Sequence, residues 1–71
     1  MTVELKAGVI GTGRLGSIHS RVYTEIPHIR LAGVCDTDTN KAEAIANTYH
    51  TMAFTDYRSL IPHVDIVSIA T

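Results

Sequence analysis

The sequence predicts an α/β fold in which a parallel sheet is covered by helices on both faces. Two observations over 71 residues support this: short apolar runs alternate with segments of helical periodicity, and glycine or proline stands at several of the junctions. Strands that alternate with helices favour right-handed crossovers, and therefore parallel strands. The predicted order is β-α-β-α-β-α-β, and we expect the strands to lie side by side in the order 3-2-1-4.

The first half of the chain contains two predicted strands with a helix between them. Residues 5–10 form an apolar run that suits a buried parallel strand and ends at Gly11. Pro27 ends the helix because proline lacks an amide donor and restricts the residue before it. Residues 29–36 are the second strand. The apolar residues that recur at helical spacing are Leu15, Ile18, Val22 and Ile26.

The second half repeats the alternation. The stretch that begins at Asp36 supplies several candidate capping residues for a second helix, including Asn40, which with Glu43 three residues on has the polar pairing of a capping box. Residues 51–55 are a short third strand, and Asp56 is expected to cap a brief helix that Pro62 closes. Residues 64–71 are the fourth strand, apolar on both faces. The apolar stripe of the second helix consists of Ala42, Ile45, Ala46 and Tyr49.

Composition excludes several classes of function. With 45% hydrophobic and 18% charged residues, the chain is typical of a soluble globular protein rather than of a disordered or membrane-spanning one. A net charge of −1 gives no electrostatic reason to expect nucleic acid or a membrane surface as a partner. The one cysteine, Cys35, cannot form an internal disulfide, and no signal peptide is recognisable. We therefore expect a cytoplasmic protein.

Residues that commonly carry catalysis or bind metals show no functional pattern. The four histidines are not spaced to converge on a metal, and the serines lack a nucleophile elbow, so packing roles are favoured for both. Cys35 lies within a predicted strand, where a thiol is usually a small core residue. We expect no metal site and no catalytic residue in these 71 residues.

The most informative motif is G-T-G-R-L-G, which follows the first strand and opens the first helix. Gly11 allows the tight turn, Gly13 lets the backbone approach a pyrophosphate, and Gly16 lets the helix lie against the sheet. The amides of Arg14 and Leu15 are expected to point at the phosphates, because the first turn of a helix has unpaired N–H groups and a positive dipole end. The alternative is a tight turn without a ligand.

An acidic residue completes this dinucleotide fingerprint. Asp36 ends the second predicted strand about 20 residues beyond Gly16, where a carboxylate accepts hydrogen bonds from the adenosine ribose. It would repel a 2′-phosphate, Asp38 adds to that repulsion, and no arginine follows within the next few residues. NAD is therefore expected as the cofactor, with NADP as a less favoured alternative that Lys41 keeps open.

The stretches "GVIGTGRLGSIHS", "VCDTD", "NKAEAIANTY", "FTDYRSLI" and "VDIVSIAT" together resemble the N-terminal half of the nucleotide-binding domain of the glucose-fructose oxidoreductase and myo-inositol dehydrogenase family, the Gfo/Idh/MocA oxidoreductases. The resemblance implies an incomplete Rossmann-like sheet and hydride transfer between a nicotinamide cofactor and a sugar, polyol or cyclitol. It also implies that the catalytic lysine of an E-K-P motif lies downstream, since Lys6 and Lys41 do not match it. The cofactor-binding residues that it implies are Gly11, Thr12, Gly13, Arg14, Leu15, Gly16, Asp36, Thr37 and Thr71.

We accordingly expect residues 1–71 to be the N-terminal part of a dinucleotide-binding domain, with the substrate domain outside this chain. The parent protein is expected to be an NAD(P)-dependent oxidoreductase, while the chain alone is not expected to be active. A fourth strand that is apolar on both faces would leave an open edge here, which favours association and a homo-oligomer. The alternative function is a non-catalytic NAD-sensing or scaffold module, and sequence beyond residue 71 would separate the two.

Overall fold

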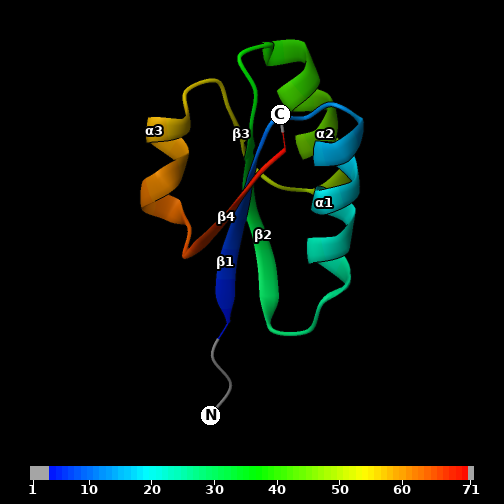
Figure 1. Cartoon of the computed structure of the whole chain (residues 1–71), viewed down its shortest axis with the longest axis vertical. Coiled ribbons are helices and arrows are strands. Elements are labelled where there is room, and N and C mark those ends of the chain that lie inside the picture. Colours follow the sequence, from blue (N-terminus) through cyan, green and yellow to red (C-terminus); the bar gives the residue numbers. More distant parts are fainter. Residues whose placement is uncertain (1–3, 71) are drawn as a thin grey trace.

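The computed structural model describes residues 4–70, which form a parallel sheet between two layers of helices (Figure 1). Each predicted helix and strand is present, although several boundaries differ. The elements are β1 (Leu5–Ile10), α1 (Arg14–Glu25), β2 (Ile29–Cys35), α2 (Thr39–Tyr49), β3 (Ala53–Phe54), α3 (Tyr57–Leu60), the 3₁₀ turn η1 (Ile61–His63) and β4 (Ile66–Ile69).

The sheet confirms the predicted topology. Its strands lie in the order β3-β2-β1-β4, and all three pairings are parallel. Helices α1 and α2 cover one face and α3 covers the other (Figure 1). Ile10 pairs with both Cys35 and Ile69, and Cys35 pairs with Phe54. Because the four strands end at the same level, the residues that follow them meet at one edge of the sheet.

Helix α1 ends before Pro27, as predicted, but its apolar stripe does not face the sheet. Its buried residues are Gly16 and Ser20, and the Ser20 hydroxyl donates to the Gly16 carbonyl at 2.8 Å. Small residues on this face let the helix backbone approach the sheet closely, which leaves larger neighbours outside the contact. The exposed fractions are 51% for Leu15, 40% for Ile18, 41% for Val22 and 38% for Ile26.

Helix α2 begins at one of the several candidate caps, although not at the one with the capping-box pairing. Asp38 is the capping residue, and its Oδ1 accepts from the amides of Asn40 at 3.0 Å and Lys41 at 3.2 Å. The capping-box interpretation of Asn40 is therefore wrong, because Asn40 already lies inside the first turn. The apolar stripe is confirmed: Ala42 and Ala46 are buried, and Ile45 and Tyr49 pack against the core.

The segment before β4 also departs from the prediction in its details. Asp56 caps α3 as expected, accepting from the Arg58 amide at 2.9 Å. The α-helix ends at Leu60, before Pro62 as expected, but the chain continues through Pro62 as the 3₁₀ turn η1. A proline near the start of a helical turn costs little, because its missing amide would have no partner there. Strand β4 starts at Ile66 rather than at residue 64, and Thr71 lies outside the described residues.

The second and third strands are each shorter than predicted, since β2 ends at Cys35 and β3 contains only Ala53 and Phe54. Asp36 is nonetheless tied to the neighbouring strand end, because its amide donates to the Phe54 carbonyl at 3.0 Å. The boundary difference therefore leaves Asp36 at the carboxyl edge of the sheet.

Two paired glycines seat α3 on its face of the sheet. Gly8 of β1 and Gly33 of β2 are in register. A Cβ atom would lie 3.0 Å from Leu60 Cδ2 at Gly8 and 2.7 Å from Leu60 Cδ1 at Gly33. The bare backbone therefore forms a shallow depression that the fully buried Leu60 side chain fills.

Leu60→Ala is expected to lower the free energy of unfolding by about 2–5 kcal/mol, because the glycines beneath it have no side chains that could fill the cavity. Ile61→Ala is the matched control: Ile61 is 46% exposed, so its truncation should cost less than about 1 kcal/mol. Urea unfolding of both variants measures the difference. Equal losses would show that Leu60 does not anchor α3.

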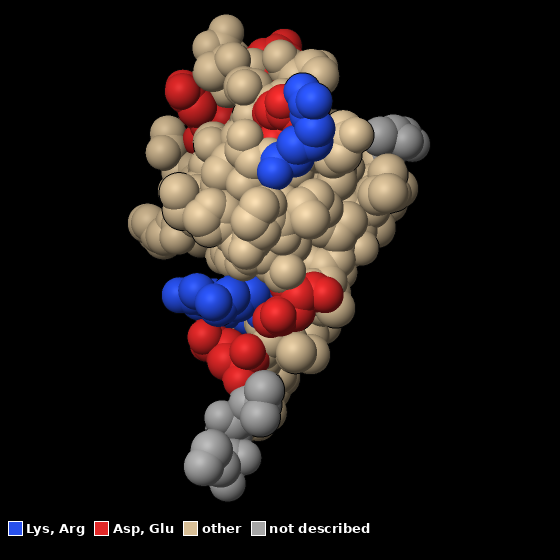
Figure 2. Space-filling view, turned by 90° about the vertical axis from the view of Figure 1, so that its left-hand side faces the viewer, with Lys and Arg blue, Asp and Glu red and all other residues tan. Residues whose placement is uncertain are grey.

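Charged side chains on the α3 side are of mixed sign. In Figure 2, basic and acidic side chains lie next to one another in separate charged areas, and uncharged surface lies between these areas. Arg58 of α3 pairs with Asp56 at 2.8 Å, and Arg30 pairs with Glu4 at 3.6 Å. Within residues 4–70, no helix has both the length and the apolar character needed to cross a membrane.

Candidate functional site

A pocket of about 590 Å³ opens at the carboxyl edge of the sheet. The residues that line it end or follow each of the four strands, because these strands end at the same level of the sheet. Most of the predicted cofactor residues meet here, although they come from distant parts of the sequence. The lining residues are Ile10, Gly11, Thr12, Gly13, Cys35, Asp36, Thr37, Thr55, Asp56, Tyr57 and Ala70.

The glycine loop forms one wall of this pocket. Gly11 adopts φ 98°, a left-handed conformation that favours glycine, and its amide donates to the Cys35 carbonyl at 2.7 Å. A Cβ at Gly16 would lie 1.7 Å from the Gly11 carbonyl oxygen. Helix α1 can therefore start this close to β1 only with glycine at position 16.

The first turn of α1 presents backbone donors without a protein cap. Gly13 is the capping residue, and no side chain caps the helix. The first bond of the helix runs from the Ser17 amide to the Gly13 carbonyl at 2.9 Å, so the amides of Arg14, Leu15 and Gly16 have no partner within the helix. Unpaired amides at the positive end of a helix dipole form a site for an anion.

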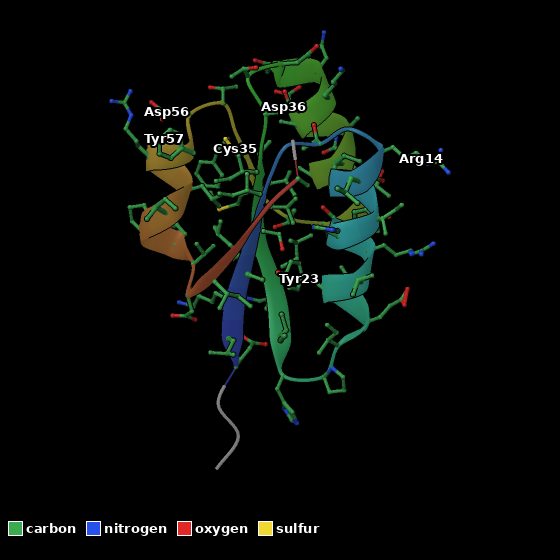
Figure 3. All side chains as sticks on the ribbon, viewed as in Figure 1. Arg14, Tyr23, Cys35, Asp36, Asp56 and Tyr57 are labelled. Atoms are coloured by element: carbon green, nitrogen blue, oxygen red, sulfur yellow. The ribbon has the colours of Figure 1, made fainter. Side chains whose placement is uncertain are left out.

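Arg14 and Leu15, whose amides are predicted to point at the phosphates, keep their side chains out of the pocket. The Arg14 side chain extends away from Asp36 and the sheet (Figure 3), and Leu15 is 51% exposed. Neither residue lines the pocket. Their contribution to an anion site would therefore come from the backbone amides, as the sequence predicted, and not from the guanidinium charge.

Asp36 faces the glycine loop across the strand ends. Its Oδ2 accepts from the Thr12 amide at 2.9 Å and from the Thr12 hydroxyl at 2.8 Å, and its Oδ1 accepts from the Asp38 amide at 2.9 Å. These hydrogen bonds, the one from Asp38 first, lower the pKa of the Asp36 carboxyl below its usual value, and the Lys41 charge adds to the effect. A fixed carboxylate thus stands beside the anion site.

The lowered pKa makes part of the stability depend on pH. The contribution from Asp36 is fully present above the pKa of the unfolded chain, about 4, and is lost as the pH falls through the lower folded-state pKa. The parent protein should therefore have a higher free energy of unfolding than Asp36→Asn at pH 6, and this difference should shrink as the pH is lowered to 3. Urea unfolding of both proteins at the two pH values measures it, and a constant difference would contradict the assigned hydrogen bonds.

The sequence-based prediction missed the wall formed by the β3–α3 junction. Thr55, Asp56 and Tyr57 line the pocket, and Figure 3 shows Asp56 and Tyr57 on the other side of Asp36 from Arg14. Tyr57 is 56% exposed. The predicted strand order 3-2-1-4 could have indicated this wall, because it places the end of β3 next to the end of β2.

Cys35 lines the base of the pocket but is poorly suited to act as a nucleophile. Its side chain is buried, and burial raises the pKa of the thiol, as do the negative charges of Asp56 and Asp36. The thiol therefore stays protonated at neutral pH, in keeping with the core role expected for it.

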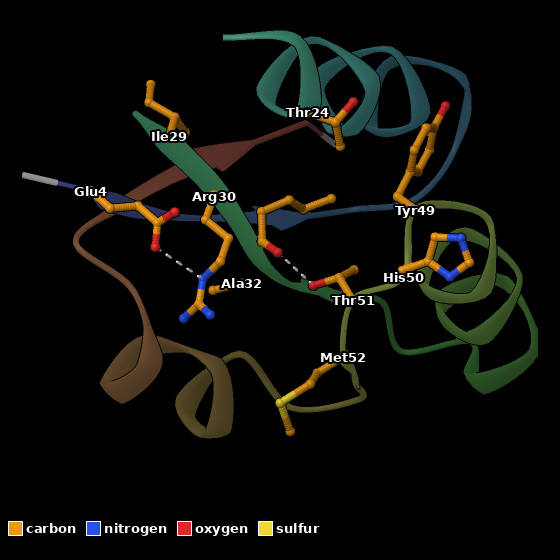
Figure 4. Close-up of a pocket in the computed structure, with 10 residues that line it drawn as sticks. Glu4, Thr24, Ile29, Arg30, Ala32, Tyr49, His50, Thr51 and Met52 are labelled. Carbon is orange, nitrogen blue, oxygen red and sulfur yellow. Dashed lines mark hydrogen bonds and ion pairs between the residues drawn. The ribbon is translucent and has the colours of Figure 1, made fainter. Parts of the chain in front are cut away.

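A second pocket, of about 540 Å³, surrounds the amino-terminal half of β2 (Figure 4). Several of its polar groups are engaged within the chain: Arg30 pairs with Glu4 at 3.6 Å, and the Thr51 hydroxyl donates to the Leu31 carbonyl at 2.8 Å. It contains no helix N-terminus and no glycine loop. Across residues 4–70, no group of three or more histidine, cysteine or acidic side chains could hold a metal ion. The carboxyl-edge pocket is therefore the candidate site.

Comparison with known proteins identifies relatives of this chain. The oxidoreductase family with an NAD-binding Rossmann fold, Gfo/Idh/MocA, matches residues 5–71. UDP-N-acetylglucosamine 3-dehydrogenase of Acidithiobacillus ferrooxidans is 38% identical over 69 residues, which are 97% of this chain and 21% of that protein. Inositol 2-dehydrogenase of Salmonella typhimurium is 34% identical over 67 residues, 90% of this chain and 20% of that protein.

Solved structures show the same relationship. GenD2 from gentamicin A biosynthesis, in complex with NAD, superposes with a TM-score of 0.93 at 27% identity, covering 100% of this chain and 21% of that one. Scyllo-inositol dehydrogenase of Lactobacillus casei, with NAD(H) and scyllo-inositol bound, gives a TM-score of 0.85 at 26% identity over 96% of this chain and 21% of that one. The chain spans about a fifth of the length of these relatives. It belongs to the Gfo/Idh/MocA oxidoreductase family and forms part of that family's NAD-binding Rossmann fold.

Proposed function

We propose that residues 4–70 form the part of an NAD-dependent dehydrogenase that holds the diphosphate and adenosine ribose of the cofactor. The observation that carries the proposal is the meeting, in one pocket, of the uncapped first turn of α1 and the fixed carboxylate of Asp36. The first suits a diphosphate and the second suits the sugar attached to it.

The residues present fit this cofactor. Gly13 is exposed, and a Cβ at this position would meet no atom within 4 Å, so the space beside the first turn is free for a phosphate. The amides of Gly13, Arg14 and Leu15 would donate to the diphosphate oxygens. Asp36 would accept from a ribose hydroxyl, with Thr37 beside it. When bound, the cofactor supplies the nicotinamide that accepts or donates the hydride.

The same carboxylate supports NAD over NADP. Asp36 is ionised at neutral pH, as aspartates ordinarily are, and its hydrogen bonds lower its pKa further. A 2′-phosphate on the ribose would bring further negative charge against it, and Asp38 lies two residues away. The positive charge of Lys41 acts on Asp36, but one exposed lysine offsets little of that repulsion.

Relatives that are named for sugar or inositol oxidation support a sugar, polyol or cyclitol substrate for the parent protein. Hydride transfer needs groups that position the carbinol against the nicotinamide and move its proton. We place those groups outside residues 4–70, in a substrate domain. The role of this part of the chain is to hold and orient the cofactor.

Titration of the full-length protein with NADH and NADPH, followed by cofactor fluorescence, tests the proposal. We expect NADH to bind at least about ten times more tightly, the factor that corresponds to about 1.4 kcal/mol. Assays with NAD and a panel of inositols and nucleotide-linked aminosugars then test the activity. NADH binding without turnover of any polyol would favour a cofactor-sensing module, and failure to bind either cofactor would contradict the proposal.

A further inference from the structure

Thr12 is buried even though it lies in the glycine loop at the mouth of the pocket. Its exposed fraction is 6%, whereas Gly13 next to it is exposed. Both of its donors are engaged by one atom, Oδ2 of Asp36, at 2.9 Å from the amide and 2.8 Å from the hydroxyl. Thr12 therefore has no donor free for a phosphate, unlike the residues that follow it in the loop.

The hydrogen bonds to Asp36 are distributed unevenly over its two oxygens. A carboxylate has about four acceptor positions, two on each oxygen. Thr12 occupies both positions on Oδ2, while the Asp38 amide occupies one on Oδ1. One position remains, and it is on Oδ1. The orientation of the Asp36 carboxylate is therefore fixed, and it can accept one further hydrogen bond.

We propose that Thr12 is a positioning residue for cofactor selection, whose amide and hydroxyl hold Oδ2 of Asp36 so that Oδ1 meets a ribose hydroxyl and opposes a phosphate there. The inference rests on the proposed function and assigns Thr12 a role that it exerts through Asp36 instead of by contact with the cofactor. A hydroxyl donates to Oδ1, whereas a phosphate dianion has no proton to donate and is repelled. This arrangement distinguishes NAD from NADP only if the Asp36 carboxylate cannot rotate away from the ribose.

The decisive variant is Thr12→Val, which keeps the shape of the side chain and removes the hydroxyl. We expect the Kd for NADH to rise roughly three- to ten-fold, less than for loss of a direct hydrogen bond to a charged group, because the Thr12 amide still holds Oδ2 in this variant. The Kd for NADPH should change less, because that ligand gains nothing from a fixed carboxylate. The ratio of the NADPH Kd to the NADH Kd should therefore fall.

Two further variants separate positioning from a structural effect on the loop. Thr12→Ser restores the hydroxyl and should return the ratio to within about two-fold of the parent value. Thr48→Val removes a hydroxyl from α2 that donates to the Ala44 carbonyl, remote from the pocket, and should change neither Kd. A general disturbance of the glycine loop would weaken NADH and NADPH equally, since both carry the same diphosphate.

The outcomes are distinct. A parent protein that binds neither NADH nor NADPH overturns the proposed function and this inference with it. A parent that prefers NADH, with an unchanged ratio in Thr12→Val, overturns the inference alone. A lower ratio in Thr12→Val that Thr12→Ser does not restore also overturns it, because the hydroxyl would then not be the cause. A lower ratio that Thr12→Ser restores supports it.

Discussion

Gly16→Ala is expected to lower the free energy of unfolding by more than about 3 kcal/mol, at or beyond the upper end of the range for overpacking. The added Cβ would lie 1.7 Å from the Gly11 carbonyl oxygen and 2.7 Å from its carbon. Both are backbone atoms at the end of β1, so no side-chain rotation relieves the clash. Helix α1 would have to move away from the sheet. Thermal and urea unfolding measure the loss.

Gly13→Ala is the matched control within the same motif. Its Cβ would meet no atom within 4 Å, and Gly13 has φ −69°, which alanine adopts readily. Stability should therefore change by less than about 1 kcal/mol. NADH affinity should nevertheless fall, because the methyl group would occupy the space proposed for the diphosphate. If the two variants lost equal stability, the distinct roles assigned to these glycines would be wrong.

Asp36→Ala is expected to weaken NADH binding by roughly 10- to 100-fold, as for loss of hydrogen bonds to a charged group. The variant removes the acceptor for the ribose and frees both donors of Thr12. NADPH binding should weaken much less, because the repulsion of the 2′-phosphate disappears at the same time. Fluorescence titration of both cofactors measures the change in preference.

A second acidic residue provides the control for this variant. Asp65 accepts from the Lys6 amide at 2.8 Å, close to the opposite end of β1 from the pocket. Asp65→Ala removes the same charge from the chain and should leave both affinities within about two-fold of the parent values. Equal effects of the two substitutions would indicate that total charge, and not the ribose contact, determines cofactor affinity.

Local patterns in the sequence predict the topology well because each strand and helix is marked by its own apolar spacing and by a residue that ends it. The helix boundary at Pro27 and the cap at Asp56 depend on groups a few residues apart, and both are found. Asp38 and Asn40 were harder to separate, since each is a good capping residue. The extended backbone conformation of Asp38 makes it the capping residue, and the local sequence does not reveal that conformation.

Long-range packing explains what the sequence left unpredicted. The stripe from Leu15 to Ile26 has helical spacing, yet tight contact at Gly16 and Ser20 determines which face of α1 is buried. The seat for Leu60 depends on two glycines that become neighbours only when β1 and β2 pair. The bonds between Thr12 and Asp36 join residues 24 positions apart, so a motif that is read along the chain identifies both residues but not their interaction.

Amide chemical shifts during NADH titration test most directly whether the first turn of α1 holds the diphosphate. With isotope-labelled full-length protein, we expect the largest changes at the amides of Gly13, Arg14 and Leu15, with smaller ones at Asp36 and Thr37. ADP-ribose, which lacks the nicotinamide, should reproduce them. Changes centred instead on Leu31, His50 and Thr51, around the second pocket, would contradict the account.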